Sequence, residues 1–432
     1  MQRARGDSIQ LLYALAVLAA TGVALLAVGL GGGRAAGELS ERDAIAARGA
    51  AITPEVARRV AELRELEFEA VPAPEVIGSD DLSGLIEADF RRRLGDPEEA
   101  LAPDEAIARI VGLLGAGQTL GGFVEASGDL AAAAWETRTG TLYLIDDAVA
   151  TPALLELFLA HELTHAIEDQ SFGLPEPDPD DADRALAETA LVEGTATALM
   201  TEYADRHLSA FALAASALDL DPGTDGFPRY AVEQLEWAYL GGSRFVERLY
   251  ELGDGWTLVD HALEHRPPAS TSQVLHPIKY LRDERPLAVE TDSEVLRAAG
   301  WEPEHAGTVG ELATAQLLAL GVPRRVAADG AEGWRGDRYE LWERGTAAAD
   351  CRHPCRDELV LVLRWRWDSP AEAREFARAA RSYLQRGIGG ERAGRGLWSL
   401  DGGWAALATR SDATGLAFAP SPSLALGAAA GG

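Results

Sequence analysis

The pentapeptide His161-Glu162-Leu163-Thr164-His165 constrains this chain more than any other feature of its sequence. Residues four apart on an α-helix lie on the same face, so the two imidazoles are neighbours and can bind one metal ion. Glu162 follows the first imidazole, where its carboxylate can reach a water held by that ion. This H-E-x-x-H arrangement is typical of zinc hydrolases.

The residues around the pentapeptide predict a helix. Thr151 is a good N-cap, Pro152 suits the first helical position, and Gly173 favours an end. Leu154 and Phe158 share 3.6-residue spacing with the two histidines, so the imidazoles continue an inward-facing apolar stripe. The alternative is a pair of core histidines that are hydrogen-bonded to carbonyl groups.

A second helical run, from about Ala182 to Arg206, offers a third ligand. Glu193 has apolar and small neighbours, which predicts a closely packed face, and Gly194 allows a second helix backbone to approach. Glu188 lies about 140° around the helix from Glu193, so both carboxylates are not expected at one ion. We favour Glu193, because Glu188 lies in a more polar stretch that we expect to face solvent.

These segments resemble the gluzincin class of zinc metallopeptidases. The stretch from Ala160 to Gln170, with Ala190-Leu191-Val192-Glu193-Gly194, is similar to a largely uncharacterised group of prokaryotic exported or surface proteins that are predicted to be zinc peptidases. The likeness extends to the segments Pro267–Pro277 and Gly333–Asp337, and covers most of residues 120–380.

The resemblance implies that His161, His165 and Glu193 hold one Zn²⁺ with an open position for water. Glu162 would take the proton of that water, and the hydroxide would attack a peptide bond of a peptide or protein substrate. Thr197 departs from the pattern, because gluzincins often carry an acid there that orients a ligand histidine.

A tetrahedral intermediate also needs a hydrogen-bond donor for its oxyanion. His276 and Tyr280 are candidates, because they lie beside Pro277 in an expected loop, although structural hydrogen bonding is the alternative for both.

A function of a different class is also open. The chain would then be a non-catalytic surface or envelope protein that uses a zinc-stabilised, peptidase-like fold for binding. A protein without any metal is a third reading.

Charge and the amino terminus bear on partners and location. The net charge of -30 argues against nucleic acid as a partner, because such a surface repels phosphates. Arg3 and Arg5 precede the uncharged apolar run Leu11–Leu30, which is long enough for one membrane-spanning helix. We therefore expect a membrane-anchored protein with its bulk outside the cytoplasm, or a secreted protein if the run is a cleaved signal peptide.

Both cysteines lie in the short segment Cys351-Arg352-His353-Pro354-Cys355. Outside the cytoplasm, a local Cys351–Cys355 disulfide is the expected state. A metal site with His353 is the alternative, although it lacks a fourth ligand.

The overall pattern predicts an α+β, mainly helical protein with a zincin-like metallopeptidase core, a small sheet, and a smaller α+β C-terminal domain. We expect a signal anchor at 1–37, a helical region at 38–118, a catalytic domain at 119–305, a C-terminal domain at 306–418 and a disordered tail at 419–432. Strands are expected at 122–125 and 141–145, with a turn at Thr139-Gly140, and at 358–367. In the last of these strands, arginines at 364 and 366 alternate with tryptophans at 365 and 367, so one face is basic and the other aromatic. We expect Tyr239, Phe245, Tyr250 and Trp256 in the core.

Overall fold

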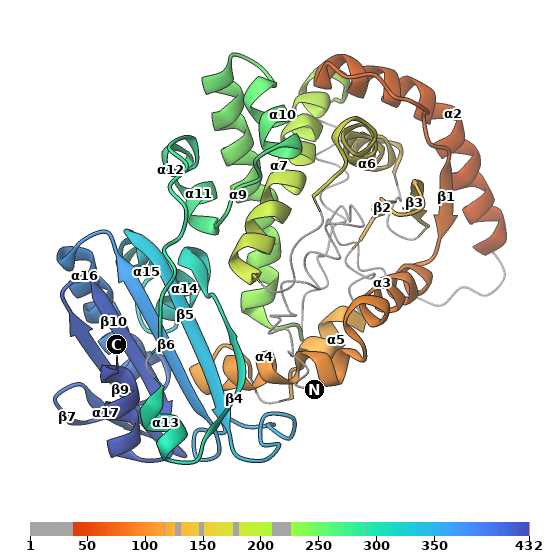
Figure 1. The fold of residues 1–432 in the computed structure, drawn as a ribbon. Helices are drawn as coiled ribbons and strands as arrows, with labels where there is room; N and C mark the ends of the chain where they lie inside the picture. The colour runs from red at the N-terminus through yellow and green to blue at the C-terminus, as the bar shows by residue number, and fades with distance from the viewer. Residues whose placement is uncertain are drawn as a thin grey trace, which may run out of the picture.

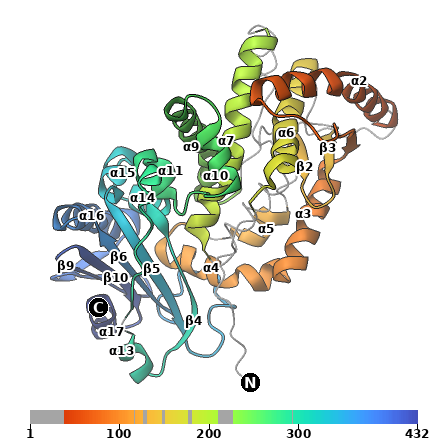
Figure 2. The same cartoon turned by 45° about the horizontal axis from the view of Figure 1, so that its top comes forward.

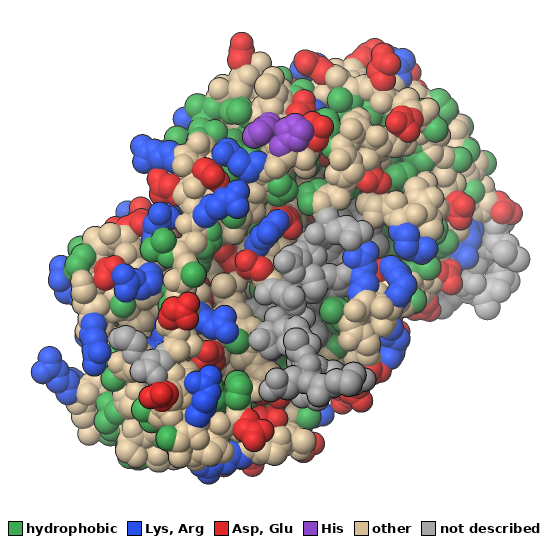
Figure 3. All heavy atoms as spheres, viewed as in Figure 1, with side chains coloured by type: hydrophobic (Ala, Val, Ile, Leu, Met, Phe, Trp, Pro, Cys, Tyr) green, Lys and Arg blue, Asp and Glu red, His purple; other side chains and the backbone are tan. Residues whose placement is uncertain are grey.

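The computed structural model describes residues 38–115, 117–125, 131–146, 151–175, 181–209, 226–291 and 293–431. A helical half with a three-stranded sheet lies beside a half built on a seven-stranded sheet (Figure 1). Figure 2 shows the same two halves from a second direction. The mixed α+β, mainly helical class is therefore confirmed. On the face drawn in Figure 3, acidic, basic and hydrophobic side chains are interspersed.

The helical half follows the chain from its first described residue. Its elements are α2 (Glu38–Arg64), β1 (Pro74–Ile77), α3 (Ser79–Leu94), α4 (Pro97–Val111), α5 (Leu120–Glu125), β2 (Ala133–Glu136), β3 (Thr141–Ile145), α6 (Pro152–Phe172), α7 (Ala182–His207), α9 (Arg229–Gly253), α10 (Thr257–Glu264), α11 (Thr271–Leu275) and α12 (Pro277–Leu281). Helices α2, α3 and α4 lie within the region 38–118 that we expected to be helical, with the short strand β1 between α2 and α3.

The small sheet has the strand order β1-β3-β2, with β1 parallel and β2 antiparallel to β3. The strand at 141–145 and the turn at Thr139-Gly140 are confirmed. The strand at 122–125 was wrong, because α5 occupies these residues. Leu120, Phe123 and Val124 are buried at three- and four-residue spacing, which fits a helix better than an alternating strand.

The second half contains α13 (Glu294–Ala298), β4 (Glu302–Gly307), α14 (Gly310–Ala319), α15 (Arg324–Ala331), β5 (Trp334–Glu343), β6 (Val360–Trp367), α16 (Pro370–Ser382), a π-helical turn (Tyr383–Gly387), β7 (Glu391–Gly394), β8 (Leu397–Leu400), β9 (Gly403–Arg410), β10 (Ala413–Ala419) and α17 (Pro422–Ala430). The strand order is β4-β5-β6-β10-β9-β8-β7, and every neighbouring pair is antiparallel. Because β4 begins at Glu302, this sheet starts slightly before the expected boundary at 306.

Strand β6 has the two faces that its sequence indicates. Trp365 and Trp367 are buried, and both pack on Phe376 of α16. Their ring centroids lie 4.7 and 4.8 Å from the ring centroid of Phe376. The opposite face carries Arg364 and Arg366, which alternate with the tryptophans along the strand.

The expected disordered tail at 419–432 was wrong for the residues that the structure describes. Strand β10 continues to Ala419, and α17 follows with Pro422 at its start and the hydroxyl of Ser421 accepting the N–H of Leu424. The alanine-rich composition that suggested disorder instead lets α17 pack closely on the sheet, since its buried positions are small.

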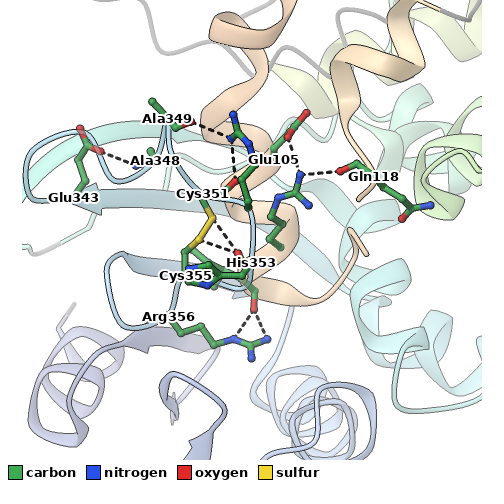
Figure 4. Close-up of a disulfide and its surroundings, with 12 residues drawn as sticks. Glu105, Gln118, Glu343, Ala348, Ala349, Cys351, His353, Cys355 and Arg356 are labelled. Atoms are coloured by element: carbon green, nitrogen blue, oxygen red, sulfur yellow. Dashed lines mark hydrogen bonds and ion pairs between the residues drawn. A yellow bond between two sulfur atoms is a disulfide. The ribbon is translucent and has the colours of Figure 1, made fainter. Parts of the chain in front are cut away.

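The cysteines form the expected disulfide. Cys351 and Cys355 are bonded to each other, with Cα atoms 6.0 Å apart, and both are buried (Figure 4). The neighbouring Arg356 donates from Nε and Nη2 to the carbonyl of Ile110 at 2.9 and 2.7 Å, which ties the loop to the end of α4. Nδ1 of His353 accepts the N–H of Cys355 at 3.0 Å.

Two buried aspartates lie where the two halves of the molecule meet. Asp183, near the start of α7, accepts hydrogen bonds from the N–H and the hydroxyl of Thr271. Asp337 of β5 accepts the N–H groups of Val309 and Gly310 at 2.6 and 2.8 Å, at the start of α14. The N–H of Leu312 in α14 in turn donates to the hydroxyl of Thr271 at 3.2 Å, so the segments around 267–277 and 333–337 meet at one junction beside the α7 N-terminus.

Burial raises the pKa of both aspartates. The pKa of Asp183 lies well above its usual value, although the hydroxyl of Thr271 partly opposes the shift. Burial raises the pKa of Asp337 to about 6, against the opposing hydrogen bonds from Val309, Gly310 and Trp334.

The predicted membrane-spanning segment, Leu11–Leu30, is not among the residues that the structure describes. Within the described ranges, no helix has both the length and the apolar character needed to cross a bilayer.

Candidate metal centre

Helix α6 presents the two histidines as its sequence predicts. The helix begins at Pro152, with the Thr151 hydroxyl accepting the N–H of Leu154 at 3.2 Å, and it ends at Phe172 before Gly173. His161 and His165 lie one turn apart, with Nε2 atoms 3.0 Å from each other. Both side chains are buried.

Helix α7 packs beside α6 and supplies the carboxylate. Oε2 of Glu193 lies 3.2 Å from Nε2 of His161 and 3.5 Å from Nε2 of His165. Glu193 is 0% exposed, so the three groups share one buried position. The structure therefore brings together the three residues that the sequence selected as metal ligands.

The spacing of the three atoms fits a metal ion. Ligands that surround Zn²⁺ tetrahedrally at about 2.0–2.1 Å lie about 3.3 Å from one another. The separations of 3.0, 3.2 and 3.5 Å bracket that value. Among the described residues, Nδ1 of both histidines and Oε1 of Glu193 lack a hydrogen-bond partner, so the group is not explained as an ordinary buried hydrogen-bond network.

The protonation states also suit cation binding. Burial lowers the pKa of His161, and the nearby His165 acts in the same direction, while Glu193 opposes the shift. Burial alone would raise the pKa of Glu193, but the two imidazoles outweigh it and the pKa is lowered. A neutral imidazole and an ionised carboxylate are the forms that bind metals.

Glu162 lies on the same helix directly after the first histidine and is 0% exposed. Its two carboxylate oxygens are buried together with the ligand atoms. A carboxylate in this position is suited to hold and move a proton, because little bulk water competes for it.

A close helix crossing fixes the position of Glu193. A Cβ atom added at Gly194 would lie 2.2 Å from the backbone carbon of Gly242 in α9, and one added at Gly242 would lie 1.9 Å from the carbonyl oxygen of Ala190. Gly194 therefore permits the backbone approach that the sequence predicts, although the approaching helix is α9 rather than α6.

Helix α9 also contributes Tyr239, which we expected in the core. Its ring stacks on His161, with centroids 5.9 Å apart and planes 24° apart. Of the other aromatic residues expected in the core, Phe245 is buried and Trp256 is half-buried, whereas Tyr250 is 41% exposed. The sequence did not indicate that Tyr239 stacks on His161, because the two residues lie far apart in the chain.

A buried ion pair lies along α6 beyond the histidines. Nε of Arg64 in α2 lies 2.6 Å from Oε1 of Glu168, and both side chains are 0% exposed. Arg64 also contacts Asp260 at 2.6 Å and lies over the ring of Trp256. Burial raises the pKa of Glu168, although Arg64 opposes the shift. Sequence reasoning missed this pair, because its members are 104 residues apart.

Glu188 does not join the group. It is buried rather than solvent-facing as we expected, and it lies 2.7 Å from Nε of Arg184 one turn earlier in α7. The ion pair with Arg184 explains how the carboxylate of Glu188 can be buried.

The structure does not bring His276 and Tyr280 to the three ligand atoms. Nε2 of His276 lies 2.7 Å from Oε1 of Glu311 in α14. The hydroxyl of Tyr280 donates to the carbonyl of Arg266 at 2.9 Å. Both residues belong to the segment of α11 and α12, which lies on the other side of α7 from α6 in Figure 1.

A second group of potential ligands lies at the disulfide loop. His353, Asp357 and Glu358 are exposed and close together. Nδ1 of His353 already accepts a backbone hydrogen bond, which places the ring proton on Nε2 and leaves that nitrogen without a lone pair for a metal.

The comparisons with known proteins concern the second half of the chain. A family model described as a domain of unknown function (DUF8575) matches residues 297–425, from α13 through the seven-stranded sheet into α17. No curated protein and no solved structure matches the chain. The candidate metal centre of α6 and α7 lies outside the matched segment.

Proposed function

We propose that the chain is a zinc-dependent peptidase of the gluzincin type, built on a zincin-like core. The observation that supports this most directly is the convergence of His161, His165 and Glu193 at mutual distances of 3.0–3.5 Å, with Glu162 adjacent on the same helix. Metal retention alone requires three ligands, whereas a carboxylate beside them serves proton transfer.

The residues of the chain have separate roles in this proposal. A Zn²⁺ ion held by the two imidazoles and Glu193 supplies a Lewis acid that polarises a peptide carbonyl and lowers the pKa of water. Glu162 accepts the proton of the attacking water and passes it to the leaving amine. Tyr239 limits how the His161 ring can turn, because the two rings are stacked.

The small sheet offers a means of substrate binding. Strand β2 is an edge strand of the order β1-β3-β2, and it packs beside α6. An extended peptide can add to such an edge through main-chain hydrogen bonds. We also place the reaction outside the cytoplasm, because the Cys351–Cys355 disulfide is typical of oxidising compartments.

The second candidate is a non-catalytic surface protein whose fold is stabilised by zinc. The complete burial of the ligand side chains favours this candidate, since a catalytic metal keeps one coordination position open for water or substrate. The two candidates agree on metal binding and differ in turnover.

Elemental analysis combined with peptide-cleavage profiling tests both. The peptidase requires about one zinc per chain and cleavage that stops with a chelator and returns with added zinc. Full zinc content, loss of fold on chelation and no cleavage of a diverse peptide library would favour the binding protein. A protein that contains no zinc and folds normally would overturn both.

A further inference from the structure

The basic face of β6 continues across two neighbouring strands. In the antiparallel register, Arg366 pairs with Ala413 of β10, and Ala413 pairs with Arg410 of β9. Arg364 pairs with Gly415 in the same way. Since neighbouring strands lie about 4.8 Å apart and residues two apart on a strand about 6.8 Å, the three arginines start within about 12 Å of one another on one face of the sheet.

Only part of this face is covered. Helix α17 packs over its other end, where Val360, Val362 and Ala417 join a small apolar core with Ala425 and Ala428. Beyond the last turn of α17 the face opens into a hollow of about 540 Å³. We call it the arginine hollow. It is lined by Leu287, Ala288, Val289, Glu290, Thr291, Arg364, Trp365, Arg366, Ala408, Arg410, Ala413, Thr414, Gly415, Ala429 and Ala430.

Small side chains create the depth of the arginine hollow. Ala408, Ala413 and Gly415 lie between the arginines, so the floor is low and the guanidinium groups form its margin. A Cβ atom at Gly415 would lie 2.3 Å from the carbonyl oxygen of Ala429 and 3.6 Å from Nη1 of Arg364. This glycine therefore permits the close approach of α17, whereas the distance to Arg364 would be an ordinary contact.

The three guanidinium groups differ in how they are held. Arg364 is 7% exposed and donates from Nη2 to the carbonyl of Ala428 at 2.7 Å, which fixes it at the end of α17. Arg366 pairs with Asp412 at 3.0 Å across a partly exposed contact. Within the part of the chain that the structure describes, the guanidinium group of Arg410 forms no hydrogen bond or ion pair.

The charge of the lining is opposite to that of the chain. Acidic residues outnumber basic ones by 69 to 39 in the whole sequence, whereas the arginine hollow has three arginines and one acid, Glu290. A guanidinium group binds carboxylate and phosphate oxygens through two parallel hydrogen bonds. The volume also lies within the range of about 300–1,000 Å³ that small-molecule sites occupy.

We propose that the arginine hollow is a binding site for a small anionic ligand, which it holds by a carboxylate or phosphate group. Arg366 and Arg410 contact the anion from two sides, and Arg364 is held in place at the margin beside the end of α17. The site lies on the sheet that the family match covers, and it does not depend on the proposed peptidase activity.

Calorimetric titration of the full chain with inorganic phosphate and, separately, with succinate tests the proposal. We expect binding of at least one anion that weakens as sodium chloride is added. Arg366→Gln and Arg410→Gln should each weaken it about tenfold, because each removes one charged partner. Arg378→Gln is the matched control, since this exposed arginine lies on α16, on the opposite face of the sheet.

The two probes also identify the kind of ligand. Binding of phosphate alone indicates a phosphorylated ligand, and binding of succinate alone indicates a carboxylate ligand. Circular dichroism confirms that each variant is folded. No binding of either anion at concentrations up to about 10 mM would overturn the proposal. Equal binding by the wild type and both hollow variants would overturn it as well.

Discussion

Gly194 and Gly242 bring the backbones of α7 and α9 into direct contact beside Glu193. A Cβ atom on either glycine would lie within 2.2 Å of a backbone atom of the other helix. Because the nearest atoms belong to the backbone, a side-chain movement cannot relieve this contact. The third candidate ligand is therefore positioned by a helix that carries none of the ligands itself.

We predict that Gly242→Ala forces α7 and α9 apart. The free energy of unfolding should fall by about 1–3 kcal/mol, and zinc content should fall as well, because Glu193 moves away from the imidazoles. Denaturant unfolding and elemental analysis measure the two effects. Gly84→Ala is the control, since a Cβ atom there meets nothing within 4 Å and should stabilise α3 by about 0.5–1 kcal/mol. Wild-type stability of Gly242→Ala would contradict the close crossing.

Glu162→Gln should retain zinc and lose peptide cleavage. The amide keeps the size of the side chain but cannot accept a proton, so we expect turnover to fall by about 10²–10⁴-fold with little change in KM. Glu156→Gln, on the same helix, should leave turnover unchanged. Steady-state kinetics with one cleaved peptide decides the matter, and cleavage at the wild-type rate by Glu162→Gln would exclude the assigned role.

Arg64→Met should destabilise the protein strongly. Glu168 would lose its partner while it stays buried, which typically costs about 3–5 kcal/mol. The double variant Arg64→Met/Glu168→Leu should recover much of this loss, because no buried charge remains. Arg58→Met, at an exposed position of α2, should leave the free energy of unfolding almost unchanged. If the single and double variants are equally unstable, the cost comes from packing rather than from the unpaired charge.

The junction at Asp337 should make stability depend on pH. Its pKa of about 6 in the folded protein lies above the value of 3.8 for an ordinary aspartate, so the folded state holds the proton more tightly. The resulting stabilisation is complete below about pH 4 and is lost as the pH rises to about 6, with a total near 2–3 kcal/mol. Comparison with Asp337→Asn between pH 4 and pH 7 isolates this contribution. The difference in the free energy of unfolding between the wild type and Asp337→Asn should fall as the pH rises over that interval. A difference that stays constant would refute the assigned titration of Asp337.

Local sequence signals determined the elements that carry the candidate centre. The caps at Thr151 and Gly173 and the histidine spacing predict α6, and the small residues around Glu193 predict close packing of α7. The two faces of β6 and the 351–355 disulfide were predicted in the same way, because neighbours in the sequence decide them. Where the signal was too short or only compositional, at 122–125 and at 419–432, the prediction was wrong.

Tertiary structure alone decided which distant groups meet. The pairing of Arg64 with Glu168, the stacking of Tyr239 on His161 and the distance of His276 from the centre depend on how helices pack, and no local pattern records this. The arginine hollow likewise arises from the register of three strands and from the place where α17 ends. Local spacing fixes which face of an element a residue occupies, but the partner across that face is chosen by the burial of apolar surface over the whole chain.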